Sequence, residues 1–142
     1  MELAEVRRLV RKAIESAKKE SAERRQRSDA AARAYALFLE QHAVPTFHTF
    51  ATALAGEGIR FKVFTPAESV RLAAEGASDD FIELSLDTTQ DPPRVLGRTS
   101  RARGRRAQSS ERFVRDNAEV GQLTDDDVLQ YLLAEIGPFV ER

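Results

Sequence analysis

Phe81-Ile82-Glu83-Leu84-Ser85-Leu86-Asp87 is the stretch in which apolar and polar side chains alternate most cleanly. Successive side chains of a β-strand point to opposite faces, so Ile82, Leu84 and Leu86 share one face of the predicted strand. The other face carries Glu83. A strand that is apolar on one side is typical of an antiparallel sheet with one covered face. The segment therefore predicts a sheet with helices packed on the Ile82 side.

Further strands are predicted on both sides of this segment. Residues 59–64 (IRFKVF) alternate in the same way, and residues 69–73 (SVRLA) predict a second strand, followed by a turn from Gly76 to Asp79. After the loop Asp91-Pro92-Pro93, a fourth strand is predicted from Arg94 to about Arg106. Residues 111–114 either continue it or form a fifth strand after a bend near residues 108–110. We expect a four- to five-stranded antiparallel meander, because strands joined by short turns pair with their neighbours.

The beginning of the chain predicts a long helix. From Glu2 to Ala43 there is neither glycine nor proline, and most residues are strong helix formers. A continuous helix of about 40 residues would be roughly 60 Å long, whereas a compact domain of this size is about 30–40 Å across. The helix therefore either breaks near Ser28-Asp29 or projects beyond the globule. We favour projection, because a helical hairpin turn usually contains glycine and none is present here.

Two more helices follow from local signals. Val44-Pro45 predicts a break, since proline disfavours helical geometry in the residue before it, and then a second helix that ends at Gly56. Thr124 and Asp127 have the spacing of a capping box at the start of a last helix. Gly137-Pro138 is expected to end that helix.

Together these elements predict an α+β fold in two parts. Residues 1–43 form the long N-terminal helix, a candidate coiled-coil or oligomerisation element. Residues 44–142 form the domain, with the second helix, the antiparallel sheet and the C-terminal helix, and the helices lie on one sheet face.

Composition narrows the functional classes. The net charge of −1 produces no overall field toward nucleic acid or membranes. The chain has no cysteine, which excludes disulfides, thiolate chemistry and cysteine-ligated zinc and fits a reducing cytoplasm. No apolar run approaches the length of a membrane span, and residues 1–5 lack the order of a signal peptide. Because arginine greatly outnumbers lysine, we interpret the codon usage as that of a GC-rich bacterial genome. We predict a cytoplasmic, bacterial protein.

A narrow apolar seam follows the first turns of the long helix. Its members recur at spacings of three and four residues, as in a coiled coil: Leu3, Val6, Val10, Ala13 and Ala17. Residues 18–29 then contain a single apolar side chain, Ala22. If the helix projects, the domain does not reach this seam, and a second copy of the chain is the simplest cover. The seam predicts a homodimer.

Charge changes sign across the predicted sheet. Residues 79–91 contain five acids and no base, and residues 94–115 contain eight arginines and one acid. In an extended strand, neighbouring arginines alternate between faces, so that the five candidate binding residues divide into two groups: Arg101, Arg103 and Arg105 on one face, and Arg98 and Arg106 on the other.

Guanidinium groups in a row suit phosphates or carboxylates, because each donates a bidentate pair of hydrogen bonds. Three interpretations of these arginines stay open. They pair across strands with Glu83 and Asp87, they bind an acidic protein surface, or they bind nucleic acid. The lack of aromatic residues between the arginines argues against nucleic acid.

Other candidate chemistry is weak. His42 and His48 are six residues apart, roughly 240° around a helix, and so are unsuited to share a metal ion. Three consecutive acids, Asp125–Asp127, are explained by the positive end of a helix dipole. Glu83 and Asp87 lie roughly 13 Å apart along a strand, too far for a paired carboxylate site. We expect no metal, no cofactor and no catalytic residue.

The sequence therefore predicts a non-catalytic protein-interaction module that self-associates through its N-terminal helix. A nucleic-acid-binding protein that uses the arginine-rich strand 94–106 is the first alternative. A small enzyme with an arginine and carboxylate site on the open sheet face is the second.

Overall fold

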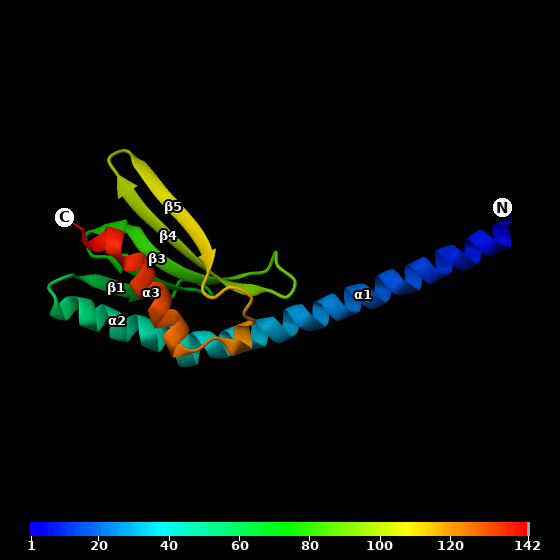
Figure 1. Cartoon of the computed structure of the whole chain (residues 1–142), viewed down its shortest axis with the longest axis horizontal. Coiled ribbons are helices and arrows are strands. Elements are labelled where there is room, and N and C mark those ends of the chain that lie inside the picture. Colours follow the sequence, from blue (N-terminus) through cyan, green and yellow to red (C-terminus); the bar gives the residue numbers. More distant parts are fainter. Residues whose placement is uncertain (142) are drawn as a thin grey trace.

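The computed structural model describes residues 1–141 and shows the predicted α+β fold (Figure 1). Helices α1 (Leu3–Phe38) and α2 (Val44–Gly56) are joined by a π-helical turn, η1 (Leu39–Ala43). A short 3-10 turn, η2 (Val120–Gln122), precedes the last helix, α3 (Asp125–Val140). Five strands lie between them: β1 (Phe61–Phe64), β2 (Val70–Ala74), β3 (Ala77–Asp87), β4 (Arg94–Arg103) and β5 (Arg106–Phe113). We call residues 39–141 the body.

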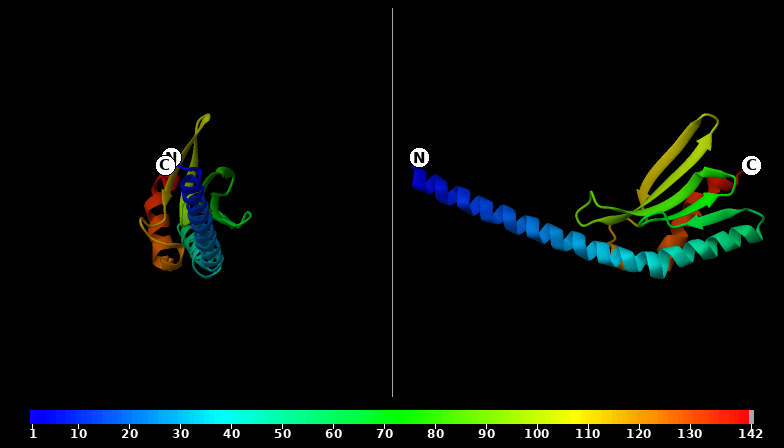
Figure 2. Two further views of the ribbon diagram at one scale, coloured as in Figure 1. Left: turned by 90° about the vertical axis from the view of Figure 1, so that its right-hand side faces the viewer. Right: turned by 180° about the vertical axis from the view of Figure 1, so that it is seen from behind.

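The sheet is the antiparallel meander that the sequence predicts. Its strand order is β1-β2-β3-β4-β5, so each strand pairs with its neighbours in sequence. Ile82 of β3 pairs with Leu72 of β2 and with Thr99 of β4. These residues lie on the inner face, which packs against α2 and α3 (Figure 2). The opposite side of the sheet, which carries Glu83, is the outer face.

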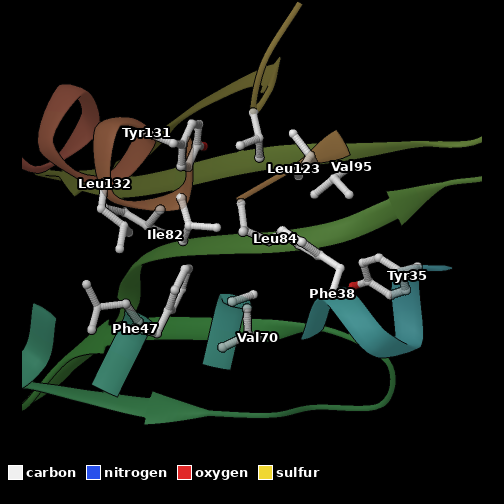
Figure 3. Packing of buried hydrophobic residues seen from close by; sticks show 14 of the residues in the cluster. Tyr35, Phe38, Phe47, Val70, Ile82, Leu84, Val95, Leu123, Tyr131 and Leu132 are labelled. Atoms are coloured by element: carbon white, nitrogen blue, oxygen red, sulfur yellow. The ribbon is translucent and has the colours of Figure 1, made fainter. Parts of the chain in front are cut away.

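The core fills the space between the inner face and the helices. Ile82 and Leu84 lie at its centre and are fully buried, surrounded by side chains from all three helices (Figure 3). Tyr131 of α3 lies directly over Gly97 of β4, where an added Cβ atom would be 2.1 Å from a ring carbon. Only glycine at position 97 allows the tyrosine ring to lie so close to the strand.

Helix α1 is continuous through Ser28 and projects from the body (Figure 1). Every residue from Leu3 to Ala30 is exposed or half-exposed, and Ala31 is the first buried one. These residues span about 40 Å at 1.5 Å per residue. The helix is gently curved, and its concave side is the side on which the body lies (Figures 1 and 2).

The junction between α1 and α2 is a bend and not the predicted break. Pro45 does lie in the first turn of α2, as its sequence position predicts, but the chain stays helical through Val44. A proline lacks the N–H that would bond four residues back, and its ring collides with that carbonyl, here the one of Gln41. The wider π-helical turn at residues 39–43 relieves this collision and keeps the two helices joined.

Two other boundaries differ from the prediction. The turn between β2 and β3 lies at Glu75-Gly76, and β3 already begins at Ala77, because only Gly76 adopts a left-handed backbone there (φ 82°). Helix α3 continues past Gly137-Pro138 to Val140. So close to a helix end, Pro138 removes only one hydrogen bond. The last turn is held by Phe139, whose ring packs edge-on against that of Phe61 at 6.3 Å.

The arginine-rich strand is a hairpin. Strand β4 ends at Arg103, Gly104 turns the chain with a φ of 60°, and β5 begins at Arg106, which pairs with Arg103. The prediction of one strand as far as Arg106 was therefore wrong, as was the bend near residues 108–110. Arg105 lies in the turn, so it does not extend the row of Arg101 and Arg103 along one face.

Candidate functional site

The projecting part of α1 exposes an apolar surface. Leu3 is 73% exposed, and Leu9, Val10 and Ile14 are each at least half exposed. Val6 is half-buried by its own helix neighbours, and Ala13 and Ala17 are exposed. We call this surface the tip stripe; it consists of Leu3, Val6, Leu9, Val10, Ala13, Ile14 and Ala17. A shallow groove along it is bordered by Arg7 and Arg11.

The tip stripe is wider than the seam predicted from the sequence. Leu9 and Ile14 belong to it, although a strict spacing of three and four residues omits them. At 100° per residue they fall at the two edges of an apolar surface roughly 140° wide. A helical-wheel projection of residues 3–17 would have found both.

The arginines of the hairpin divide into two groups. Toward the base of the hairpin they have partners: Arg98 lies 3.4 Å from the Glu83 carboxylate, and Arg112 pairs with Glu135 of α3. Arg101 donates to the backbone carbonyl of Pro138 at 2.8 Å, and Arg115, just after β5, pairs with Asp127 at 3.1 Å. These contacts attach the base of the hairpin to β3 and α3.

The three arginines at the hairpin tip, Arg103, Arg105 and Arg106, have no such contacts. Within residues 1–141 their side chains form neither an ion pair nor a hydrogen bond, and all three are exposed. The tip stands clear of the helices (Figure 1). Asp80 lies beside the hairpin, where its carboxylate accepts a hydrogen bond from the Ala102 backbone N–H at 2.8 Å. The tip therefore presents cationic groups that the rest of the described chain leaves unneutralised.

A compact ionic cluster occupies the centre of the outer face. Glu83 is only 8% exposed. Its carboxylate forms ion pairs with Arg71 of β2, at 2.7 Å, and with Arg98 of β4. Both guanidinium groups also lie over the ring of Phe81, at 4.0 and 5.2 Å from its centre. Glu83 is thus neutralised, and Arg98 is held in the cluster.

The second acid predicted to pair with the arginines behaves differently. Asp87 lies opposite Arg94 in the sheet register, yet its carboxylate accepts hydrogen bonds from the backbone N–H and the hydroxyl of Thr89. The Thr89 hydroxyl is the main cause that lowers the pKa of Asp87 below its usual range. Arg94 stacks instead on the ring of Phe113, 4.2 Å from its centre.

One of the two histidines contacts the acidic triplet at the start of α3. His42, in the π-helical turn, bonds through Nδ1 to the carboxylate of Asp125, and His48 is exposed. Asp127 forms the capping box with Thr124 that the sequence predicts. Throughout residues 1–141, no group of three or more His, Asp or Glu side chains is arranged to hold a metal ion.

An ion pair fixes α1 where it leaves the body. Arg27 donates two hydrogen bonds of 2.9 Å to the carboxylate of Asp91, in the loop between β3 and β4. The Arg27 hydrogen bond is the main cause that lowers the pKa of Asp91. About two turns further along, Tyr35 donates to the backbone carbonyl of Glu68. Burial of Tyr35 is the main cause that raises its pKa. These contacts fix the direction in which α1 projects.

No helix among the described residues combines the length and the apolar character needed to cross a bilayer. No protein-family model, curated protein or solved structure matches this chain.

Proposed function

We propose that this protein is a non-catalytic interaction module that self-associates through the tip stripe of α1. The observation that carries the proposal is the part of α1 before Arg27, which forms no ion pair or side-chain hydrogen bond with the body while exposing leucine, valine and isoleucine side chains. Most helices in proteins are stabilised by packing of their apolar face. An apolar surface left open in the single chain is typical of a protein interface.

A second copy of the chain is the partner that can match the tip stripe with a tip stripe of its own. On a helical wheel at 100° per residue, Arg7, Arg11 and Lys18 lie beyond the Ile14 edge, and Glu2 and Glu20 lie about 20° inside the Leu9 edge. The apolar side chains between these charges can be covered by the same side chains of a second copy, as in the interface of a two-fold symmetric dimer.

Light scattering across a range of protein concentrations tests the proposal. We expect the wild-type mass to rise from monomer to dimer in the micromolar range. Val10→Glu places a charge within the tip stripe and should leave a monomer. Ala22→Glu adds the same charge on the same exposed helix, outside the stripe, and should dimerise like the wild type. A wild-type monomer at the highest concentration, or equal dimerisation of both variants, would contradict the proposal.

A second candidate function, binding of nucleic acid, is favoured by the unpaired arginines of the hairpin tip. Residues 99–110 contain arginine, serine, threonine, glutamine, glycine and alanine but no large apolar side chain. Protein interfaces usually have an aromatic or aliphatic anchor, whereas phosphate contacts come from arginine, serine, threonine and glutamine. A two-stranded ribbon also fits the major groove of DNA.

The double variant Arg103→Gln/Arg106→Gln tests this second candidate. Its control is Arg33→Gln/Arg60→Gln, which removes the same charge from exposed positions elsewhere. If the tip binds phosphates, only the first double variant loses binding to a labelled duplex. The wild-type affinity should then fall with salt, with a slope near −2 in log K against log salt for two contacts. Absence of binding by the wild type at low salt would remove this candidate.

A cytoplasmic, bacterial origin remains a proposal that rests on the cysteine-free, arginine-rich composition. Fractionation of the native host would test it.

A further inference from the structure

We infer that the two copies pair with their α1 helices antiparallel, so that the two bodies lie at opposite ends of the dimer. The inference rests on the proposed self-association and adds the orientation of the second copy. It follows from which side of α1 faces its own body.

The tip stripe and the body lie on the same side of α1. Near the body, the helix face that turns inward carries Arg27, Ala31, Tyr35 and Phe38, which contact the body or are buried. At 100° per residue, the centre of this face lies within about 50° of the centre of the tip stripe. The concave curvature of α1 toward the body agrees with this placement (Figures 1 and 2).

A parallel pair is therefore blocked by the bodies. In a parallel coiled coil both tip stripes face the dimer axis, and so do both bodies, at the same end. Paired helices have axes about 8–10 Å apart. A body of roughly 100 residues has a radius of gyration near 13 Å, so two bodies do not fit between the axes. The contact of Arg27 with Asp91 shows that the body already occupies this side at residue 27.

An antiparallel pair avoids the overlap and packs the stripe more evenly. When Val10 faces Ala13 of the second copy, Val6 faces Ala17, and each layer combines a large with a small side chain. Leu3 then lies against the aliphatic part of Glu20, which is still short of Arg27. In a parallel pair each residue faces the same residue of the second copy, so the side chains in successive layers would become smaller from Leu3 to Ala17.

The charges beside the stripe favour the parallel arrangement, because an antiparallel pair brings each charged edge against the same edge of the second copy. These exposed charges are too weak to decide the orientation. A parallel register would place Glu2 beside Arg7 and Leu9 beside Ile14 of the second copy. An exposed ion pair stabilises by about 0.2–1 kcal/mol. An overlap of two folded bodies is a steric exclusion that contacts of this size do not overcome.

Distance measurement by pulsed electron paramagnetic resonance tests the orientation. The chain has no native cysteine, so Asp29→Cys takes a single nitroxide label at an exposed site outside the stripe. With Val10 facing Ala13, the two labels of an antiparallel pair are about 50 Å apart at 1.5 Å per residue. In a parallel pair they would be within about 20 Å, given the spacing of paired helices. We expect the long distance.

Disulfide cross-linking provides an independent readout. Leu3→Cys and Glu20→Cys should form a mixed disulfide when combined, and each variant alone should form little. Efficient self-cross-linking of Leu3→Cys, or a short label distance, would overturn the antiparallel orientation while leaving self-association intact. A monomeric mass for the labelled protein and for the wild type would instead overturn the proposed function itself.

Discussion

The contact between Gly97 and Tyr131 sets how closely α3 approaches the sheet. The ring of Tyr131 occupies the space that a side chain at residue 97 would take, directly over the strand backbone. Arg112 lies over the same ring at 4.6 Å and pairs with Glu135, so the tyrosine is held from both sides. Small changes here should displace a whole helix.

Gly97→Ala should destabilise the protein, because the new methyl group overlaps the Tyr131 ring. Overpacking of this kind costs about 1–3 kcal/mol in unfolding free energy. Gly56→Ala is the matched control: the site has open space and lies in the last turn of α2, where alanine is favoured by about 0.5–1 kcal/mol. Urea unfolding of both variants measures the difference, and equal midpoints would show that α3 can shift without loss.

Glu83→Gln should also destabilise, because it leaves two arginines facing a neutral side chain on the outer face. The guanidinium groups are partly exposed, so we expect the free energy of unfolding to fall by about 1–3 kcal/mol, which is less than for a fully buried pair. Glu111 is an exposed acid on β5 and is the other cross-strand neighbour of Arg98. Glu111→Gln should change the free energy of unfolding by less than about 0.5 kcal/mol. Thermal unfolding measures the difference between the two variants. Equal midpoints would contradict a special role for Glu83.

At the scale of the elements, the local signals were sufficient for prediction and the distant ones were not. The alternation in residues 81–87 and the capping box of α3 depend on neighbours within four residues, and both are present in the structure. The Arg27–Asp91 pair joins residues 64 positions apart, and no sequence pattern indicates it. The continuation of α3 through Pro138 depends on the packing of Phe139 against β1, which is equally distant.

The hairpin was predictable in principle. Gly104 between arginines is an isolated glycine in a strand pattern, which is a turn signal. Without apolar residues to show which face is buried, however, the register of residues 94–113 was undetermined. The sorting of its arginines into paired and unpaired groups followed only from the structure.

The contact between α1 and the β3–β4 loop should be visible in the titration of Asp91. Its pKa in the folded state is lowered by Arg27, relative to about 3.9 for an unperturbed aspartate. The stabilisation from this pair is therefore present above about pH 4 and is lost as the pH falls through the folded-state pKa. Carbon-detected NMR should find a low midpoint in the wild type and a normal one in Arg27→Gln. A low midpoint in both would mean that Arg27 is not the cause.

For the whole molecule, the distribution of contacts separates the stability of the body from the association of α1. The tip stripe touches nothing in the body, so its residues should affect unfolding only when chains associate. A partner that binds only the folded state raises the unfolding temperature by mass action.

The thermal midpoint of the wild type should therefore rise with protein concentration, and that of Val10→Glu should not. At high dilution the two midpoints should coincide, because Val10 has no partner in the single chain. Calorimetry over a hundredfold range of concentration makes the comparison. A lower midpoint of Val10→Glu at every dilution would show that the residue stabilises the monomer after all.

The position of β5 at the rim of the sheet has a consequence for how the protein behaves in a crowded solution. An outermost strand has unpaired backbone groups along one side and can template the growth of fibrils. Residues 106–112 of β5 are all exposed, and none has a large apolar side chain. Arg106, which has no acidic partner among the described residues, would also repel its counterpart in an in-register pairing of two β5 strands. Even without a ligand, these features would keep the protein from aggregating through this edge of the sheet.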